Sequence, residues 1–194
     1  MGYVKILGLL AVAAAALMAL ATTATATTIT SPTGTTYTGT IHAESEVTTT
    51  LHSELLSVSC KKSTLTGSIG THSSTGTAHG PITTLDLSEC GEDVVTVLVP
   101  GTLEIHSSST HSILTSTGAI ITVHTHVFGI DCLFETNNTD IGLLTDSHHS
   151  GRTEATLDID SALIPRTGDS MFCGPVGEWT GSYVVTTPTM LYVD

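Results

Sequence analysis

Basic residues are scarce in this chain, which holds five lysines and arginines against 18 aspartates and glutamates among 194 residues. Affinity for nucleic acid depends on Lys and Arg that neutralise phosphates, so the shortage argues against a nucleic-acid partner. It disfavours an anionic membrane surface for the same reason. Aromatic residues make up only 4% of the chain, with a single Trp. A glycosidase usually needs an aromatic platform beside two opposed carboxylates, and this composition does not favour one.

Helical patterning is also missing. After residue 26, apolar residues nowhere recur at helical spacing over three turns. Hydroxyl side chains dominate instead, because 58 of the 194 residues are Thr or Ser. Threonine loses side-chain freedom in a helix but suits the pleated surface of a strand. We therefore expect an all-β protein with very little helix.

The first 26 residues read as a secretory signal peptide. A short start with Lys5 precedes an apolar run over 6–21, and small residues then offer cleavage after Ala26 or, earlier, after Ala21. A retained membrane anchor is the alternative, but the run is shorter than the roughly 20 residues that a span needs. We expect a secreted, extracellular protein with no membrane span after signal removal.

All four cysteines, Cys60, Cys90, Cys132 and Cys173, lie after the signal peptide. An even number of cysteines in a secreted chain indicates disulfides, for which three connectivities exist. A zinc site is the alternative, but it normally shows two cysteines a few positions apart, and the closest pair here is 30 positions apart.

Period-two alternation recurs along the rest of the chain. It predicts strands over 46–55, 102–106 and 121–127, with Val123 on the inner face of the last one. The run Val94–Val99, followed by Pro100–Gly101 and then 102–106, predicts a β-hairpin.

The cysteines also anchor a loose internal repeat. We assign residues 27–38 to a flexible leader and 39–194 to one β-domain, with candidate repeats 39–100 and 101–180 and a closing strand 181–194. Chance similarity between Thr-rich strands is the alternative. If the repeat is real, each half is closed by its own disulfide, which pairs Cys60 with Cys90 and Cys132 with Cys173. Both pairs also join segments that are close in sequence, so closure costs the least entropy.

The C-terminal segment 179–193 follows a W-x-G-x-Y-x-V-x-x-P-x-x-L-Y-V pattern. Together with the four cysteines, Cys173-Gly174 and the stretch 129–132, it resembles a group of small secreted actinobacterial proteins whose activity is not established. The resemblance implies a secreted all-β domain with two disulfides. It transfers no catalytic residue.

The sharpest local pattern is formed by His124, His126 and Asp131, which resembles the first metal-binding motif of cupins. Alternation puts the two histidines on one strand face, within reach of a single ion. The same alternation puts Val123 on the opposite, apolar face, so the histidines should point to water. Asp replaces the usual Glu of the motif, and no second motif follows downstream.

Other candidate residues are better explained without chemistry. His148 and His149 lie in a polar stretch that is typical of a solvated loop. Asp158 and Asp160 alternate with apolar residues, which indicates the solvent-exposed face of a strand. Trp179 is expected in the core. No Gly-x-Ser-x-Gly elbow is present to expose a nucleophile.

These observations predict an all-β antiparallel sandwich or partly closed barrel with two disulfides. We expect a secreted or cell-surface structural or binding module without enzymatic activity, cofactor or catalytic residues, whose partner is a protein or polysaccharide at the cell surface. The alternative is a cupin-like metal-dependent barrel enzyme that uses His124, His126 and Asp131.

Overall fold

The computed structural model describes residues 27–54, 56–70, 77–107, 111–127, 129–165 and 173–194. It confirms the all-β prediction, since these segments contain strands and no helix. None of them therefore provides a helix that could cross a membrane. The predicted signal peptide, residues 1–26, lies outside the described residues. The strands are β1 (Ile29–Thr30), β2 (Thr40–Ser45), β3 (Thr49–His52), β4 (Ser57–Cys60), β5 (Lys62–Ser68), β6 (Thr77–Ser88), β7 (Val94–Val99), β8 (Thr102–Ser107), β9 (Ser112–Thr117), β10 (Ile120–Thr125), β11 (Ile130–Glu135), β12 (Thr139–Thr145), β13 (Thr156–Pro165), β14 (Val176–Thr187) and β15 (Tyr192–Val193).

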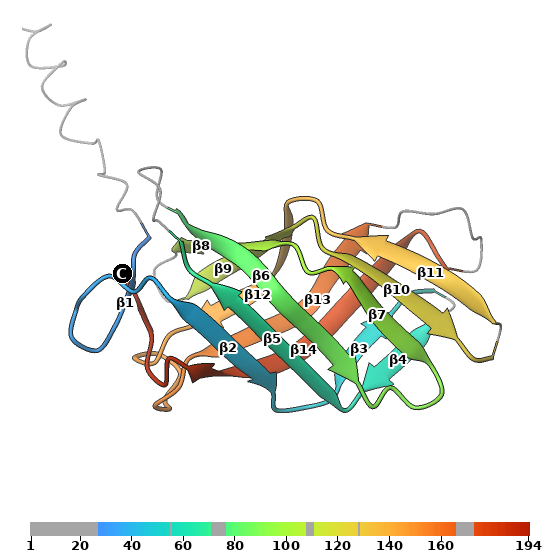
Figure 1. Ribbon diagram of the computed structural model, residues 1–194, viewed down its shortest axis with the longest axis horizontal. Helices are drawn as coiled ribbons and strands as arrows, with labels where there is room; N and C mark the ends of the chain where they lie inside the picture. Colours follow the sequence, from blue (N-terminus) through green and yellow to red (C-terminus); the bar gives the residue numbers. More distant parts are fainter. Residues whose placement is uncertain (1–26, 55, 71–76, 108–110, 128, 166–172) are drawn as a thin grey trace, which may run out of the picture.

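Eight of these strands form a closed antiparallel barrel (Figure 1). Their order around it is β13-β12-β9-β8-β6-β5-β2-β14, and the pairing of β13 with β14 closes the ring. The predicted sandwich or partly closed barrel is thus a fully closed barrel. Each of these strands therefore has a barrel neighbour on both sides, although residues 82–88 of β6 pair only with β5.

Two hairpins extend the fold beyond one end of the barrel, at the right of Figure 1. The hairpin β3–β4 continues the sheet from the first half of β14. The hairpin β10–β11 joins β7 in a separate three-stranded sheet with the order β11-β10-β7. The fully buried Phe134 of β11 lies so close to Gly177 of β14 that a Cβ atom there would come within 2.8 Å of its ring. The three-stranded sheet therefore packs against β14.

The same pairing pattern occurs twice along the chain, in a first unit from β2 to β8 and a second from β9 to β14. In each unit the first strand is followed by a hairpin, β3–β4 in the first unit and β10–β11 in the second. The first strand then pairs with the strand after that hairpin, so β2 pairs with β5 and β9 pairs with β12. The last segment of each unit pairs with the hairpin and first strand of the other. Thus β7 and β8 pair with β10 and β9, and the long β14 pairs with β3 and β2.

The predicted repeat boundaries differ from these units. A second repeat that begins at residue 101 aligns Thr102–Ser107 with the start of the first repeat at 39, but this strand, β8, ends the first unit and occupies the place of the second half of β14. The counterpart of β2 is β9. Both predicted repeats begin at a Gly-Thr dipeptide, 39–40 and 101–102. Such dipeptides recur in this Thr-rich chain, so they do not define a unique alignment of the two repeats. The predicted closing strand 181–194 is also two elements, the second half of β14 and β15.

Both predicted disulfides are confirmed. Cys60 at the end of β4 is bonded to Cys90, which follows β6, and Cys132 in β11 is bonded to Cys173, which precedes β14. No cysteine is left free. Each bond links the hairpin of a unit to the connection that follows the fifth strand of the same unit, β6 or β13, so the disulfides occupy equivalent places in the repeated pattern.

Two predicted strand arrangements are wrong. Val94–Val99 and Thr102–Ser107 are both strands, but they do not form a hairpin, because β7 pairs with β10 while β8 pairs with β6 and β9. The predicted strand 46–55 is shorter, since β2 ends at Ser45, a turn follows, and β3 covers only Thr49–His52. Val47 lies in that turn and is exposed.

The predicted flexible leader 27–38 is also wrong for its first residues. Ile29 and Thr30 form β1, which pairs with β15. Ile29 is completely buried, and the hydroxyl of Thr27 accepts a hydrogen bond from the N–H of Ser107 at 2.8 Å. Burying an isoleucine side chain stabilises this attachment by roughly 1.5–3 kcal/mol relative to exposure. The segment therefore belongs to the core, although its neighbours are turn-forming residues.

Candidate functional site

The three-stranded sheet β11-β10-β7 brings together the sequence-predicted polar residues and an exposed apolar strand. His124 of β10 is the register partner of Asp131 of β11 on one side and of Val94 of β7 on the other. Directly opposite residues of antiparallel strands point to the same face of a sheet. These three residues therefore form one row on the outer face.

The outward placement of the two histidines is confirmed. Val123 is completely buried, whereas the side chains of His124 and His126 are 49% and 64% exposed. Nδ1 of His124 lies 2.9 Å from a carboxylate oxygen of Asp131. Nε2 of His126 lies 3.6 Å from a carboxylate oxygen of Glu92 instead. The predicted extension of this strand to Val127 is wrong, because β10 ends at Thr125 and Val127 is exposed in a turn.

The cupin-like arrangement needs three side chains around one ion. The structure brings His124 and Asp131 together but directs His126 to Glu92, so the predicted set does not converge. In addition, β10 is not a strand of the barrel. Across the described segments, no three His, Cys, Asp or Glu side chains are grouped so that they could hold a metal ion.

The outer edge of the sheet is β7, and its side chains are unusually apolar for that position. Val94, Leu98 and Val99 are 54%, 57% and 43% exposed, and no charged residue lies between them. Within the described part of the chain β7 forms a ladder only with β10, and its other edge faces β6, which lies beside it without pairing. Its one irregularity is a bulge at Leu98, because consecutive residues of β10 pair with Val97 and Val99.

The second unit shows how the equivalent edge is covered. There the first half of β14 pairs with β3 on one side and with Ala162–Pro165 of β13 on the other. In the first unit the ladder between β6 and β8 ends at Pro81 and Thr102 and does not continue onto β7. The unpaired edge of β7 thus corresponds to an edge that forms a ladder with β13, the counterpart of β6, in the second unit.

Local sequence explains why β7 leaves β6. Pro100 and Gly101 interrupt the chain between β7 and β8, whereas β14 continues without a break. Gly101 has a φ of +79°, and a Cβ atom there would lie 2.5 Å from a backbone nitrogen, so only glycine fits. At the other end, Gly91 makes a turn directly after the disulfide-bonded Cys90, and Asp93 accepts the N–H of His126 at 2.9 Å. Both ends of β7 are therefore fixed.

Sequence reasoning did not identify this edge. Six consecutive uncharged residues, five of them aliphatic, are typical of a strand that is buried on both faces. The unpaired edge depends on the missing pairing with β6, which alternation alone does not reveal.

The barrel interior is not a spacious ligand chamber. An eight-stranded barrel can be filled by side chains or can hold one small ligand. Here the remaining apolar cavity measures about 50 Å³, enough for roughly one or two water molecules. It is lined by residues such as Ile41, Leu65, Leu103, Leu114 and Leu144.

Three other predicted residues have structural roles or solvent-facing positions. Asp158 accepts a hydrogen bond from the hydroxyl of Ser182 at 2.6 Å, and Asp160 is exposed on the same strand. Trp179 is buried, as expected, and its ring meets Tyr183 edge to face at 6.3 Å between centroids. None of the three lines the apolar cavity of the barrel.

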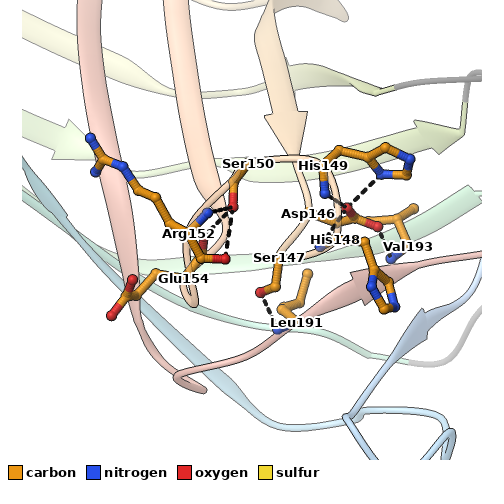
Figure 2. A network of polar contacts seen from close by, with 9 residues as sticks. All are labelled: Asp146, Ser147, His148, His149, Ser150, Arg152, Glu154, Leu191 and Val193. Atoms are coloured by element: carbon orange, nitrogen blue, oxygen red, sulfur yellow. Dashed lines mark hydrogen bonds and ion pairs between the residues drawn. The ribbon is translucent and has the colours of Figure 1, made fainter.

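His148 and His149 are exposed in a loop, but the loop is anchored rather than merely solvated (Figure 2). The buried carboxylate of Asp146 accepts the backbone N–H groups of both histidines and of Val193, and the ring of His149 lies 2.7 Å from it. The ring of His148 stacks on Tyr192 with centroids 3.9 Å apart. These contacts attach the loop to β15.

The Asp146→Asn variant tests this anchor. The replacement puts an N–H donor where a carboxylate oxygen now accepts, so we expect the free energy of unfolding to fall by about 1–3 kcal/mol near neutral pH. Burial of the carboxyl opposes its ionisation, but the N–H of Val193 and the His149 contacts outweigh burial and lower the pKa of Asp146. A lowered folded pKa gives stability above the unfolded value of about 3.9 that disappears as pH falls through the folded value.

Urea unfolding at neutral pH and at about pH 3 measures both effects, and the loss caused by Asp146→Asn should shrink at the lower pH. Asp86→Asn is the matched control, since Asp86 is exposed on β6. Equal, small losses in both variants at neutral pH would contradict the anchoring role.

No family model, curated protein or solved structure matches this chain. The resemblance to the actinobacterial group therefore stays a prediction.

Proposed function

We propose that the protein is a secreted or cell-surface binding module without enzymatic activity, and that it binds a polypeptide through the exposed apolar side chains of β7. The observation that carries the proposal is the group Val94, Leu98 and Val99, which are exposed on one strand with no charged residue between them. Exposed apolar side chains that lie together commonly mark a surface for protein interaction.

A polypeptide fits this surface better than a polysaccharide. Val94, Leu98 and Val99 are aliphatic and offer no hydrogen-bonding groups to the hydroxyls of a sugar. Sugar binding usually uses exposed aromatic rings, and the single Trp of the chain is buried. The extracellular location is supported by the two disulfides, which persist in oxidising compartments.

A short peptide tests the proposed function. We expect a peptide of alternating Thr and Val with terminal lysines to bind the protein, measured by the NMR shifts of the β7 amides. The same peptide with Ser in place of each Val should bind at least about tenfold more weakly, because it loses the apolar contacts. Leu98→Lys should weaken binding of the Thr-Val peptide at least about tenfold, since a charge replaces an exposed apolar side chain. Val47→Lys is the matched control, because Val47 is 55% exposed and lies in the turn between β2 and β3. Equal binding of both peptides would contradict recognition through apolar side chains.

The alternative, a metal-dependent enzyme that uses His124, His126 and Asp131, makes a different prediction. As a binding module, the purified protein should contain less than stoichiometric iron, manganese or zinc, and a chelator should leave its thermal midpoint unchanged. Stoichiometric metal by elemental analysis, lost when His124 and His126 are both replaced by Ala, would favour the enzyme instead.

A further inference from the structure

We infer that an open hollow on the outer face of the barrel binds a primary alkylammonium ion, such as the side chain of lysine. The hollow lies over β8, β9 and the start of β12, and none of these strands belongs to the three-stranded sheet that contains β7. Its volume of about 480 Å³ is within the range of small-molecule sites. It is lined by Glu104, His106, Ile113, Thr115, Asn138 and Asp140.

Two carboxylates flank a buried threonine in this hollow. Thr115 of β9 is the register partner of Glu104 on one side and of Asp140 on the other, so the three side chains share one face of the sheet. The neighbouring Leu114 lines the barrel cavity, so Thr115 faces outward, yet it is only 2% exposed. Its hydroxyl donates a hydrogen bond to Asp140 at 2.6 Å. Thr115 is thus the floor of the hollow and positions one of the two carboxylates.

The charge of the hollow is negative. The sequences of β8, β9 and β12 contain no Lys or Arg. Nε2 of His106 lies 3.5 Å from a carboxylate oxygen of Glu104, but a single imidazole cannot compensate two carboxylates. The hollow therefore favours a cation and disfavours phosphate or carboxylate ligands.

An ammonium group fits these carboxylates better than a metal ion or a guanidinium group. Across the part of the chain that the structure describes, no three His, Cys, Asp or Glu side chains are grouped to hold a metal ion. A guanidinium group prefers both oxygens of one carboxylate in its own plane. Here the carboxylates of Glu104 and Asp140 belong to strands two spacings apart, about 10 Å between Cα atoms. The three donors of an ammonium group can be shared between both carboxylates and the side-chain carbonyl of Asn138.

An apolar wall next to the carboxylates favours an ammonium group that carries an alkyl stem. Ile113 lies two residues before Thr115, and its register partner Leu143 lies beside it. Both are 37% exposed. A lysine side chain places its methylene groups along apolar surface and keeps its charged end in a polar environment. The stem would lie along Ile113, and the ammonium group would lie above Thr115.

An NMR titration with lysine analogues tests the site. We expect Nα-acetyl-lysine N-methylamide to shift the amides of β8, β9 and β12 with a dissociation constant of about 1 mM or below. The norleucine analogue has the stem without the charge, and ammonium chloride has the charge without the stem. Each should bind at least about tenfold more weakly than the lysine analogue.

Two variants locate the ammonium group. Glu104→Gln and Asp140→Asn should each weaken binding of the lysine analogue at least about threefold. Asp140→Asn keeps a carbonyl oxygen that can accept the hydroxyl of Thr115, so the fold should be retained. Asp86→Asn is the matched control, because it removes the same charge from an exposed position on β6, outside the hollow.

Three outcomes would overturn the inference. The first is the absence of a saturable shift up to about 20 mM of the lysine analogue. The second is equal binding of the lysine and norleucine analogues, since recognition would then rest on apolar contact alone. The third is an equal loss in the Asp86→Asn and Asp140→Asn variants, since the net charge of the whole chain would then attract the ligand.

Cadaverine, a free diamine with a similar stem, identifies the source of the ammonium group. Tighter binding of cadaverine points to a free amine, and tighter binding of the lysine analogue points to a polypeptide. Failure of the hollow to bind is also distinguishable from failure of the proposed function. The Thr-Val peptide and its Ser counterpart carry the same terminal lysines, so the difference between them measures only the apolar contacts at β7.

Discussion

Replacing Cys132 and Cys173 together by Ala is expected to lower the free energy of unfolding by about 4 kcal/mol, because the bond closes a 41-residue loop. The location of the bond adds to its importance. Among the described strands the hairpin β10–β11 pairs with β7, which belongs to the other unit, and with no strand of its own unit. Besides the backbone that joins the hairpin to β9 and β12, the disulfide is its covalent connection to its own unit. Urea unfolding followed by circular dichroism, under non-reducing conditions, measures the loss.

The Cys60→Ala, Cys90→Ala double variant is the matched comparison. Its loop has a sequence separation of 30, so the expected loss is slightly smaller, about 3.6 kcal/mol. A loss below about 1 kcal/mol for either pair would mean that strand pairing and packing alone hold that hairpin in place.

Replacing Trp179 by Ala is expected to cost about 3–5 kcal/mol, the range for removing a large aromatic side chain from a core. Trp179 is 3% exposed and lies where β14 pairs with both β3 and β13. Its ring also contacts Tyr183, whose hydroxyl lies 2.9 Å from that of Ser63 on β5. The cavity left by the substitution would thus lie at the junction between the barrel and a hairpin. Thermal and urea unfolding measure the effect.

Two milder variants show which property matters. Trp179→Phe keeps an aromatic ring and should cost clearly less than Trp179→Ala. Tyr183→Phe removes only the hydroxyl and leaves the hydroxyl of Ser63 with one partner fewer, which should cost about 1 kcal/mol. If Trp179→Ala cost no more than Tyr183→Phe, the ring would not be part of the core.

The features that sequence predicted correctly depend on local patterns. Alternation around Val123 placed His124 and His126 on the outer face, and both are exposed. The two disulfides followed from proximity in sequence and from the repeat, and both are present. Period two and chain-local cysteine pairs are properties of neighbouring residues, so they can be read without knowing the topology.

The features that sequence missed depend on distant pairings. The apolar run of β7 reads the same whether the strand is buried or at an edge, and only the missing ladder to β6 makes it an edge. Ile29 is buried because β15, more than 160 positions later, pairs with it. The anchoring role of Asp146 was not predictable, because its partner Val193 lies 47 positions away in the sequence. Such partners are set by the topology of the whole chain.

The reciprocal pairing of the two units has a consequence for how the protein unfolds. The contacts of β8 with β9 and of β14 with β2 are both seams between units, so neither half can complete a barrel from its own strands. Opening one seam also removes the strand that supports the opposite hairpin, because β14 pairs with β3 as well as with β2. The two halves therefore lose their structure together, and the duplicated architecture behaves as one cooperative folding unit rather than as two linked modules.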